Sequence, residues 1–253
     1  MTDPKDTRES PILTPQQSLA QKKLIVALDF PSATPALELA MRLEGTCSWF
    51  KVGLELYLAA GNSVVESLRR SGHSVFLDLK LHDIPNTVAG AVRSAAATGA
   101  SLLTVHALGG PAMIEAAAAE LARLDTPPKL LAVTLLTSMD AQQMRSVGLT
   151  NPSEAQVLQL AQMARTAGAD GVVASPLETA ALRKALGKEP LLVIPGIRSA
   201  DAPSDDQKRT ATPAAAIANG ASMLVVGRPI TQAADPVAAA RAILDEIALS
   251  QSF

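Results

Sequence analysis

The stretch VFLDLKLHDIPNTV, residues 75–88, decides how the rest of the chain is interpreted. It begins as an apolar strand and then places Asp78, Lys80 and Asp83 within six positions. Asp78 and Lys80 are two apart, so on an extended chain both side chains point to the same face. An acid and an amine on a buried strand are costly unless they are paired or used. Pro85 then ends the strand and suits the first turn of a helix. The stretch therefore predicts either a structural ion pair or a functional site.

Composition limits the class of protein. The 253 residues are 48% hydrophobic but only 2% aromatic, which predicts a large aliphatic core. The net charge of −2, with both signs mixed, argues against a surface for nucleic acid or for an anionic membrane. The polar stretch of residues 1–18 carries acidic residues, unlike a signal peptide, and no apolar run is as long as a membrane span of about 18 residues. We expect a cytoplasmic protein. The single Cys47 excludes an intrachain disulfide and is predicted to be a small buried hydrophobe.

Short apolar segments alternate with helical patterns along the chain. The predicted strands lie at 23–28, 48–53, 75–81, 102–105, 130–135, 171–174, 191–194 and 223–226. The predicted helices lie at 32–44, 54–70, 87–97, 111–124, a segment ending near 167, 176–186 and 236–249. Such alternation is typical of parallel strand–helix–strand units, and eight of them in about 250 residues fit a (β/α)8 TIM barrel.

The domain prediction follows from that alternation. Residues 21–253 form one catalytic barrel domain, preceded by a flexible lead-in over residues 1–20, where prolines are scattered among polar residues. An open, doubly wound sheet is the alternative. It usually carries a glycine-rich fingerprint after the first strand, but here that strand ends in Asp29-Phe30-Pro31.

Chemistry in such a barrel lies at the C-terminal ends of the strands. The polar residues at or near those ends are Asp29, Lys51, Asp78, Lys80, Asp83, His106, Thr137, Ser138, Arg198 and Arg228. The carboxylates and amines follow the first three strands, whereas glycine and arginine follow the last two. This division predicts a reactive part and an anion-binding part on different strands.

The turns after the seventh and eighth strands predict a phosphate site. Gly196 and Gly227 let the backbone approach a ligand closely, and Arg228 can bind phosphate oxygens with two hydrogen bonds. The polar connection of residues 196–212 is long for a compact domain and is interpreted as a lid, from which Gln207 could donate to the ligand. Asp78, His82 and His106 do not show the spacing of a metal site, so no metal is expected.

At residues 78–88 the chain resembles the orotidine 5′-phosphate decarboxylase family. The D-x-K-x-x-D core is shared by a wider superfamily that includes 3-keto-gulonate-6-phosphate decarboxylase and hexulose-phosphate synthase, and the IPNTV continuation is typical of the orotidylate branch. The resemblance extends to VALD at 26–29, FKVG at 50–53, VTLLTS at 133–138, PGIR at 195–198, DQKR at 206–209 and VGRPIT at 226–231.

The resemblance implies a role for each matching residue. Lys80 would give a proton to C6 of the pyrimidine, and Asp78 would lie against the substrate carboxylate. Lys51 and Asp83 would complete an alternating chain of charges, with Asp83 and Thr87 reaching across the interface of a homodimer. The remaining implied contacts are Asp29 and Lys51 to the ribose, Thr137, Ser138 and Pro195 to the base, and Arg198, Gln207, Gly227 and Arg228 to the phosphate.

The same resemblance implies a cofactor-free decarboxylase that makes uridine 5′-monophosphate in de novo pyrimidine synthesis. Loss of CO₂ from C6 leaves a carbanion that no neighbouring group delocalises, and a fixed ammonium would stabilise it as the charge develops. Two alternatives stay open from the residues. One is a metal-dependent sugar-phosphate decarboxylase or aldolase of the same superfamily, and the other is a non-catalytic nucleotide-binding protein.

Overall fold

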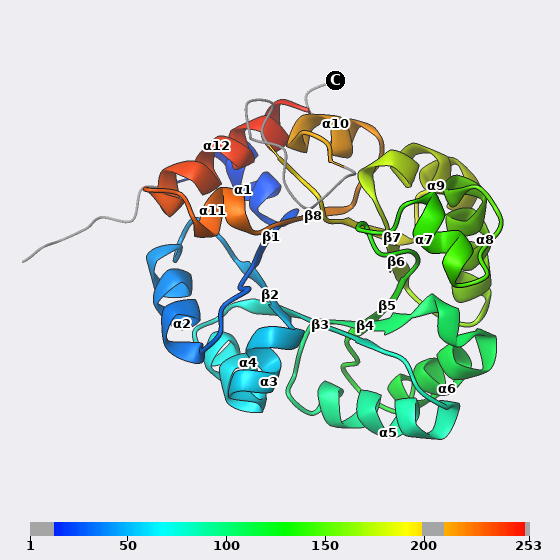
Figure 1. Cartoon of the computed structure of the whole chain (residues 1–253). Helices are drawn as coiled ribbons and strands as arrows, with labels where there is room; N and C mark the ends of the chain where they lie inside the picture. The colour runs from blue at the N-terminus through cyan, green and yellow to red at the C-terminus, as the bar shows by residue number, and fades with distance from the viewer. Residues whose placement is uncertain (1–12, 199–209, 251–253) are drawn as a thin grey trace, which may run out of the picture.

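The computed structural model describes residues 13–198 and 210–250, and these form a closed barrel of eight parallel strands in sequence order (Figure 1). The barrel closes where β1 pairs with β8, at Leu24 with Leu224 and Val26 with Val226. Helices surround the barrel on its outside. The predicted (β/α)8 barrel is confirmed, and the doubly wound alternative is wrong because the sheet has no open edge.

The element bounds follow the predicted alternation. The strands are β1 (Leu24–Ala27), β2 (Trp49–Gly53), β3 (Ser74–Leu81), β4 (Leu102–His106), β5 (Lys129–Val133), β6 (Gly171–Val173), β7 (Leu191–Ile194) and β8 (Met223–Val226). The α-helices are α1 (Pro15–Gln21), α2 (Ala33–Arg42), α3 (Leu54–Ala60), α4 (Asn62–Arg70), α5 (Pro85–Ala96), α6 (Pro111–Leu121), α7 (Ala141–Ser146), α8 (Ser153–Thr166), α9 (Thr179–Leu186), α10 (Pro213–Ala218), α11 (Arg228–Thr231) and α12 (Pro236–Leu249). A short 3₁₀ turn η1 (Ala107–Gly109) follows β4, and a second, η2 (Pro176–Glu178), precedes α9.

The core has two layers because alternate strand residues point to opposite faces. Ile25 and Ala27 belong to the layer inside the barrel, together with Phe76, whereas Leu24 and Val26 pack outward against the helices. All four residues of β1 are buried, as a parallel strand covered on both faces requires. Cys47 is also buried, which confirms its prediction as a small core residue, and burial raises the pKa of its thiol to about 12.

Two predicted helices are each divided in the structure. The single helix expected over 54–70 is divided into α3 and α4 at Gly61. The φ of Gly61 is +63°, which a right-handed helix cannot contain. The helix expected to end near 167 is α7 and α8, and Pro152 immediately precedes α8. Apolar periodicity continues across Gly61, which hides the first break. The second break is marked in the sequence by Gly148 and Asn151-Pro152, turn signals that the prediction overlooked.

Helix α1 (Pro15–Gln21) lies almost entirely within the range 1–20 that the sequence indicated as a flexible lead-in. Its capping box joins Thr14 to Gln17, and Gln17 Nε2 donates to Asp245 Oδ1 of α12 at 2.7 Å. Ala20 of this helix is fully buried. Proline at the first helical position and the Thr14 cap explain why this polar segment is helical.

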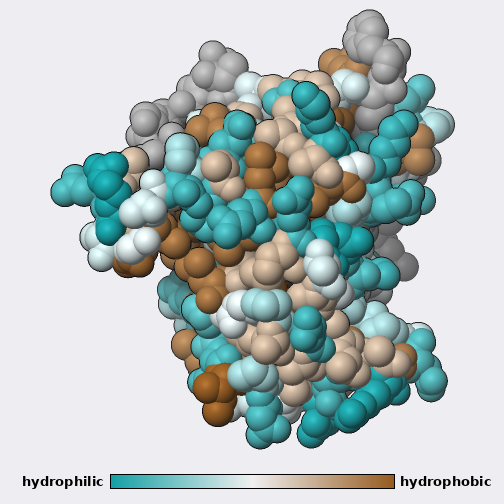
Figure 2. Space-filling view, turned by 90° about the vertical axis from the view of Figure 1, so that its right-hand side faces the viewer, coloured by the Kyte–Doolittle hydropathy of each residue, from teal (hydrophilic) through white to brown (hydrophobic). Residues whose placement is uncertain are grey.

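Figure 2 views the side of the molecule on which α8 and α9 lie in Figure 1, where hydrophilic and hydrophobic side chains intermingle. None of the helices formed by residues 13–198 and 210–250 has the length and apolar character that a membrane crossing needs.

Candidate active site

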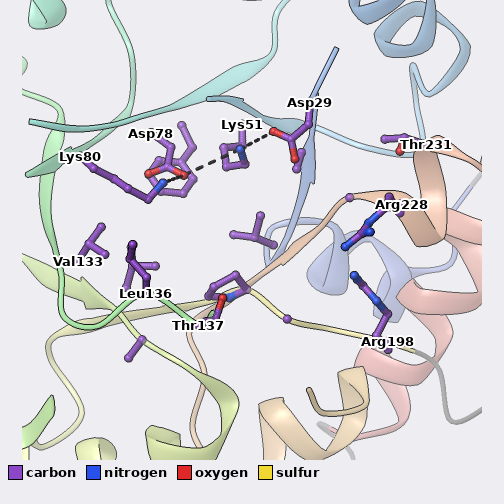
Figure 3. Close-up of a pocket in the computed structure, with 18 of the residues that line it drawn as sticks. Asp29, Lys51, Asp78, Lys80, Val133, Leu136, Thr137, Arg198, Arg228 and Thr231 are labelled. Atoms are coloured by element: carbon purple, nitrogen blue, oxygen red, sulfur yellow. Dashed lines mark hydrogen bonds and ion pairs between the residues drawn. The ribbon is translucent and has the colours of Figure 1, made fainter. Parts of the chain in front are cut away.

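A cavity of about 490 Å³ opens at the C-terminal ends of the strands, a size typical of small-molecule sites. Its lining includes Asp29, Lys51, Asp78 and Lys80 from the first three strands and their ends (Figure 3). Val133 at the end of β5 lines it together with the residues that follow, Leu135, Leu136 and Thr137. Pro195, Gly196, Arg198, Gly227, Arg228, Thr231 and Gln232 line it after β7 and β8. The predicted reactive and anion-binding parts therefore share one pocket.

The acidic and amine side chains form a continuous row along one wall (Figure 3). Lys80 Nζ lies 2.8 Å from Asp78 Oδ2, Lys51 Nζ lies 3.9 Å from the same oxygen, and Lys51 Nζ donates to Asp29 Oδ1 at 2.8 Å. The alternation follows from adjacent parallel strands, because β2 and β3 pair Gly53 with Asp78 and bring Lys51 beside it. Asp78 is thus placed between two ammonium groups.

Burial differs along this row and limits what each group can do. The Asp78 side chain is 10% exposed, whereas that of Asp29 at the pocket mouth is 60% exposed. A carboxylate as buried as Asp78 requires partners, and the two lysines supply them. Lys80 is more exposed than Asp78, so its ammonium has access to the cavity while it holds the carboxylate. The row can therefore present a positive and a negative charge side by side to a ligand.

The end of β3 departs from regular strand geometry at Lys80. Leu77 pairs with Leu103, and Leu81 pairs with Val105. Between these pairs β3 advances by four residues while β4 advances by two, so β3 has a bulge. Lys80 has a φ of +50°, and among the described residues it is the one non-glycine residue with a positive φ. Bulges of this kind occur next to active sites and redirect side chains. Regular alternation predicted that Asp78 and Lys80 share a face. In the structure the bulge and the positive φ of Lys80 set the direction in which its side chain leaves the strand to reach Asp78.

The opposite wall of the pocket is basic. Arg198 and Arg228 lie close to each other and across the cavity from Lys80 (Figure 3). Arg228 begins α11 directly after Gly227, and Arg198 Nη1 donates to the Ile197 carbonyl at 3.0 Å. A Cβ added at Gly227 would come no closer than 3.6 Å, to Ala27 Cβ, so space alone does not require glycine there in the ligand-free protein. Two guanidinium groups on this wall suit a multiply charged anion.

Several predicted site residues lie outside this cavity. Ser138 is exposed and does not line it, although Thr137 does. Asp83 and Thr87 are also exposed and away from the lining, and Asp83 Oδ1 accepts from its neighbour Ile84 N at 2.7 Å. Gln207 and the proposed lid residues 199–209 lie outside the described residues.

Two histidines stack beside the acid–amine row. The rings of His82 and His106 are 5.4 Å apart at their centroids and inclined by 19°. His106 Nδ1 accepts from Leu108 N at 3.3 Å. Burial, then the charges of His82 and Lys80, lower the pKa of His106 to about 4, so its ring is neutral near pH 7. Within 13–198 and 210–250, His, Cys, Asp and Glu side chains form no group of three that could hold a metal ion.

The sequence reasoning missed Thr104 of β4 and the pocket residues Thr231 and Gln232 of the last turn. Thr104 is fully buried, and its hydroxyl contacts both Lys80 N and Asp78 Oδ1. The one sequence signal for it is a polar residue inside the apolar strand LLTVH at 102–106. Thr231 and Gln232 follow Arg228 by one helical turn, which places them on the same side of the cavity.

A closed (β/α)8 barrel with an acid–amine row in its C-terminal pocket belongs to the class of (β/α)8-barrel enzymes. The sequence profile described as "Orotidine 5'-phosphate decarboxylase / HUMPS family" matches residues 22–243. The chain therefore belongs to this family.

Individual relatives agree over most of the chain. Orotidine 5′-phosphate decarboxylase of Anaeromyxobacter sp. (strain K) is 53% identical over 222 residues, covering 88% of this chain and 96% of the relative. That of Alkalilimnicola ehrlichii is 52% identical over 230 residues, covering 91% and 98%. The crystal structure of the enzyme of that name from Lactobacillus acidophilus superposes with a TM-score of 0.80 at 42% identity, covering 89% of this chain and 99% of the other. An uncharacterized conserved protein from Geobacillus kaustophilus gives 0.78 at 38% identity, covering 88% and 99%.

Proposed function

We propose that this protein decarboxylates orotidine 5′-monophosphate to uridine 5′-monophosphate, in pyrimidine synthesis and without a cofactor. The observation that carries the proposal is the Asp78–Lys80 pair, joined at 2.8 Å on one wall of the pocket, opposite Arg198 and Arg228 on the other. The reactive carbon would lie near Lys80 and the phosphate near Arg228. Substrate and product are charged nucleotides that do not cross membranes freely, so the proposed place of action is the cytoplasm.

The proposed chemical step uses the Lys80 ammonium twice. The bond from C6 to the carboxylate carbon breaks, CO₂ leaves, and the electron pair remains on C6. The ammonium stabilises this charge as it develops, then transfers one proton to C6 and becomes a neutral amine, which solvent reprotonates. The contact with Asp78 holds the ammonium in place before the reaction, so no reorganisation is needed at the transition state.

Asp78 would act on the substrate before CO₂ leaves. A substrate carboxylate placed at C6 beside the buried Asp78 carboxylate is repelled, and the departure of CO₂ relieves that repulsion. Lys51 and Asp29, joined at 2.8 Å near the pocket mouth, are proposed to hold the ribose hydroxyls. Thr137 and Pro195 line the cavity and are proposed to contact the base, which Ser138 would reach from just outside the lining.

The phosphate would supply binding energy far from the reacting carbon. Arg198, Gly227 and Arg228 are proposed to bind it, with Gln207 donating from the lid segment. Binding energy from a remote group can fix the ring and close the site, and thereby raises kcat and not only affinity.

We further propose that the active unit is a homodimer in which Asp83 and Thr87 enter the partner's site. Both residues are exposed and lie outside the cavity of their own chain, on the stretch 82–87, all of whose residues are exposed. Ile84 in this stretch is 67% exposed and Leu58 of α3 is 80% exposed, which are apolar side chains that a second copy would cover.

One assay tests the activity. Purified protein should consume orotidine 5′-monophosphate, followed by loss of the absorbance of the orotate ring, and the rate should be the same after exhaustive chelation. Absence of turnover would overturn the proposed function. Loss of the rate on chelation, with recovery on adding a divalent metal, would overturn the proposal that the reaction needs no cofactor. Turnover of a sugar phosphate in place of orotidine 5′-monophosphate, dependent on a divalent metal, would favour the sugar-phosphate enzyme of the same superfamily.

Co-expression of two inactive variants tests the shared site. In a hybrid of Lys80→Ala and Asp83→Ala protomers, one of the two sites has both native residues if Asp83 comes from the partner. Random pairing makes half of the dimers hybrid, so roughly one quarter of all sites should be active. A mixture as inactive as its two parents, with hybrid dimers present, would contradict the proposal, because Asp83 would then serve its own site.

A further inference from the structure

Thr104 bridges the backbone and the side chains of the acid–amine row. Its hydroxyl accepts from Lys80 N at 2.8 Å and donates to Asp78 Oδ1 at 3.0 Å. The donor direction is fixed by chemistry, since an ionised carboxylate can only accept and a backbone N–H can only donate. Thr104 does not line the cavity and is 0% exposed, so it acts on the row from behind.

The bulge explains why a hydroxyl is placed there. Between the pairs Leu77–Leu103 and Leu81–Val105, β3 has extra residues for which β4 offers no backbone partner in register. At this point Lys80 N donates to the Thr104 side-chain hydroxyl. Left-handed backbone is disfavoured for a residue with a Cβ, so Lys80 needs surroundings that hold its φ at +50°.

The second bond of Thr104 assigns the two oxygens of Asp78. Oδ1 is occupied by the Thr104 hydroxyl, which leaves Oδ2 for Lys80 Nζ at 2.8 Å, with Lys51 Nζ at 3.9 Å. One hydroxyl thus holds both ends of Lys80. It accepts from the backbone nitrogen directly, and it orients the Asp78 carboxylate that holds the ammonium. Removing the hydroxyl would leave a part-buried N–H and a buried carboxylate oxygen without this partner.

We infer that Thr104 is a positioning residue for the reaction, which sets the place of the Lys80 ammonium relative to Asp78. The inference rests on the proposed decarboxylation. It predicts a loss in kcat with little change in binding of the nucleotide. The phosphate site lies on the opposite wall, and Lys51, which is proposed to hold the ribose, also pairs with Asp29 at 2.8 Å.

Four variants test this inference, each assayed for kcat, KM, affinity for uridine 5′-monophosphate and melting temperature. Thr104→Val keeps the shape and removes the hydroxyl, and its kcat should fall by about 10- to 100-fold while KM stays within about threefold. Thr104→Ser keeps the hydroxyl and should stay within about threefold of the native kcat. Thr104→Cys offers a weaker donor and should fall between them, which provides a measurement if Thr104→Val does not fold.

Thr98→Val is the matched control. Thr98 is also buried, and its hydroxyl likewise donates to one group, Ala95 O at 2.7 Å, and accepts from another, Ala100 N at 3.4 Å. It precedes β4, at the end of the barrel away from the site. This variant should lose stability as Thr104→Val does but keep the native kcat.

Three outcomes would overturn the inference. They are a native kcat in Thr104→Val, a loss seen in KM alone, and a Thr104→Ser variant as slow as Thr104→Val. Failure of the proposed function looks different, because the native protein itself would then not consume the substrate. In that case the crystal structure of Thr104→Val or Thr104→Cys decides the positioning claim. A Lys80 that keeps its φ and its 2.8 Å contact to Asp78 would contradict it.

Discussion

The two walls of the pocket are built in different ways. On β1–β3 the charged groups hold one another, as Lys80, Asp78, Lys51 and Asp29 are linked by contacts of 2.8–3.9 Å. On β7 and β8 the wall consists of turns and two arginines, and Arg198 leads directly into the segment 199–209. The first wall is fixed before a ligand arrives, whereas the second is shaped to receive one. Substitutions on the first wall should therefore act mainly on kcat, whereas those on the second should weaken phosphate binding and, through it, can lower kcat as well.

The largest effect is expected from Lys80→Ala. This change removes both the proton donor and the charge that stabilises C6, which contribute about 10²–10⁴-fold and 10²–10³-fold. Turnover of orotidine 5′-monophosphate should fall by at least about 10⁴-fold, while uridine 5′-monophosphate still binds by calorimetry. Lys129→Ala is the control, since Lys129 is also paired to an aspartate, Asp170 at 2.9 Å, but begins β5 at the other end of the barrel. Near-native turnover in Lys80→Ala would show that the rigid wall does not perform the chemistry.

Arg228→Ala should have the next largest effect, and it should depend on the phosphate. Two charge-assisted hydrogen bonds of about 1.5–3 kcal/mol each would be lost, so kcat/KM for the nucleotide should fall by at least about 10²-fold. For orotidine, the nucleoside without a phosphate, the variant and the native protein should react at similar, slow rates. Arg123→Ala on the exposed face of the barrel controls for loss of an arginine that pairs with Glu120. Equal losses with both substrates would place the phosphate away from this wall.

A smaller pair of effects compares one glycine from each wall. At Gly53 an added Cβ would lie 2.8 Å from Lys51 Nζ, so Gly53→Ala should displace this ammonium from Asp78 and from the ribose, lowering kcat and raising KM by about 10-fold each. At Gly227 the ligand-free protein has room for a Cβ, so Gly227→Ala should fold normally and raise KM by about 10-fold because the phosphate can no longer come as close. Steady-state kinetics and melting curves of both variants measure this. A native kcat in Gly53→Ala, or a native KM in Gly227→Ala, would contradict the division into two walls.

Much of this arrangement could be predicted because it depends on local sequence. Alternating apolar segments gave the barrel, and the rule that parallel strands end at one face placed Asp78, Lys80 and Arg228 in a single pocket. The break at Gly61 was missed because apolar periodicity runs through it, whereas the break before α8 was available from Gly148 and Asn151-Pro152. Asp83 and Thr87 lie in the exposed stretch 82–87. Contact of this stretch with a second copy depends on the shape of the folded surface, which hydrophobic periodicity along the sequence does not describe.

Thr104 shows a different limit of the sequence. Its importance comes from a register shift between β3 and β4, and hydrophobic alternation contains no information about a bulge. A threonine in an apolar strand has an ordinary interpretation as a β-branched residue that fits a pleated sheet. It is the backbone of Lys80, at a φ of +50°, that distinguishes a positioning threonine from an ordinary strand threonine.

The β1–β8 pair that closes the barrel, at Leu24 and Leu224, can form only late in synthesis of the chain. Translation at about 5–20 residues per second separates these two strands by roughly 10–40 s. During that time β1 presents an unpaired edge, a feature that invites association with other nascent chains. The acid–amine row can form early, but the pocket gains its arginine wall only at the end of translation, so the ligand can stabilise only the finished chain.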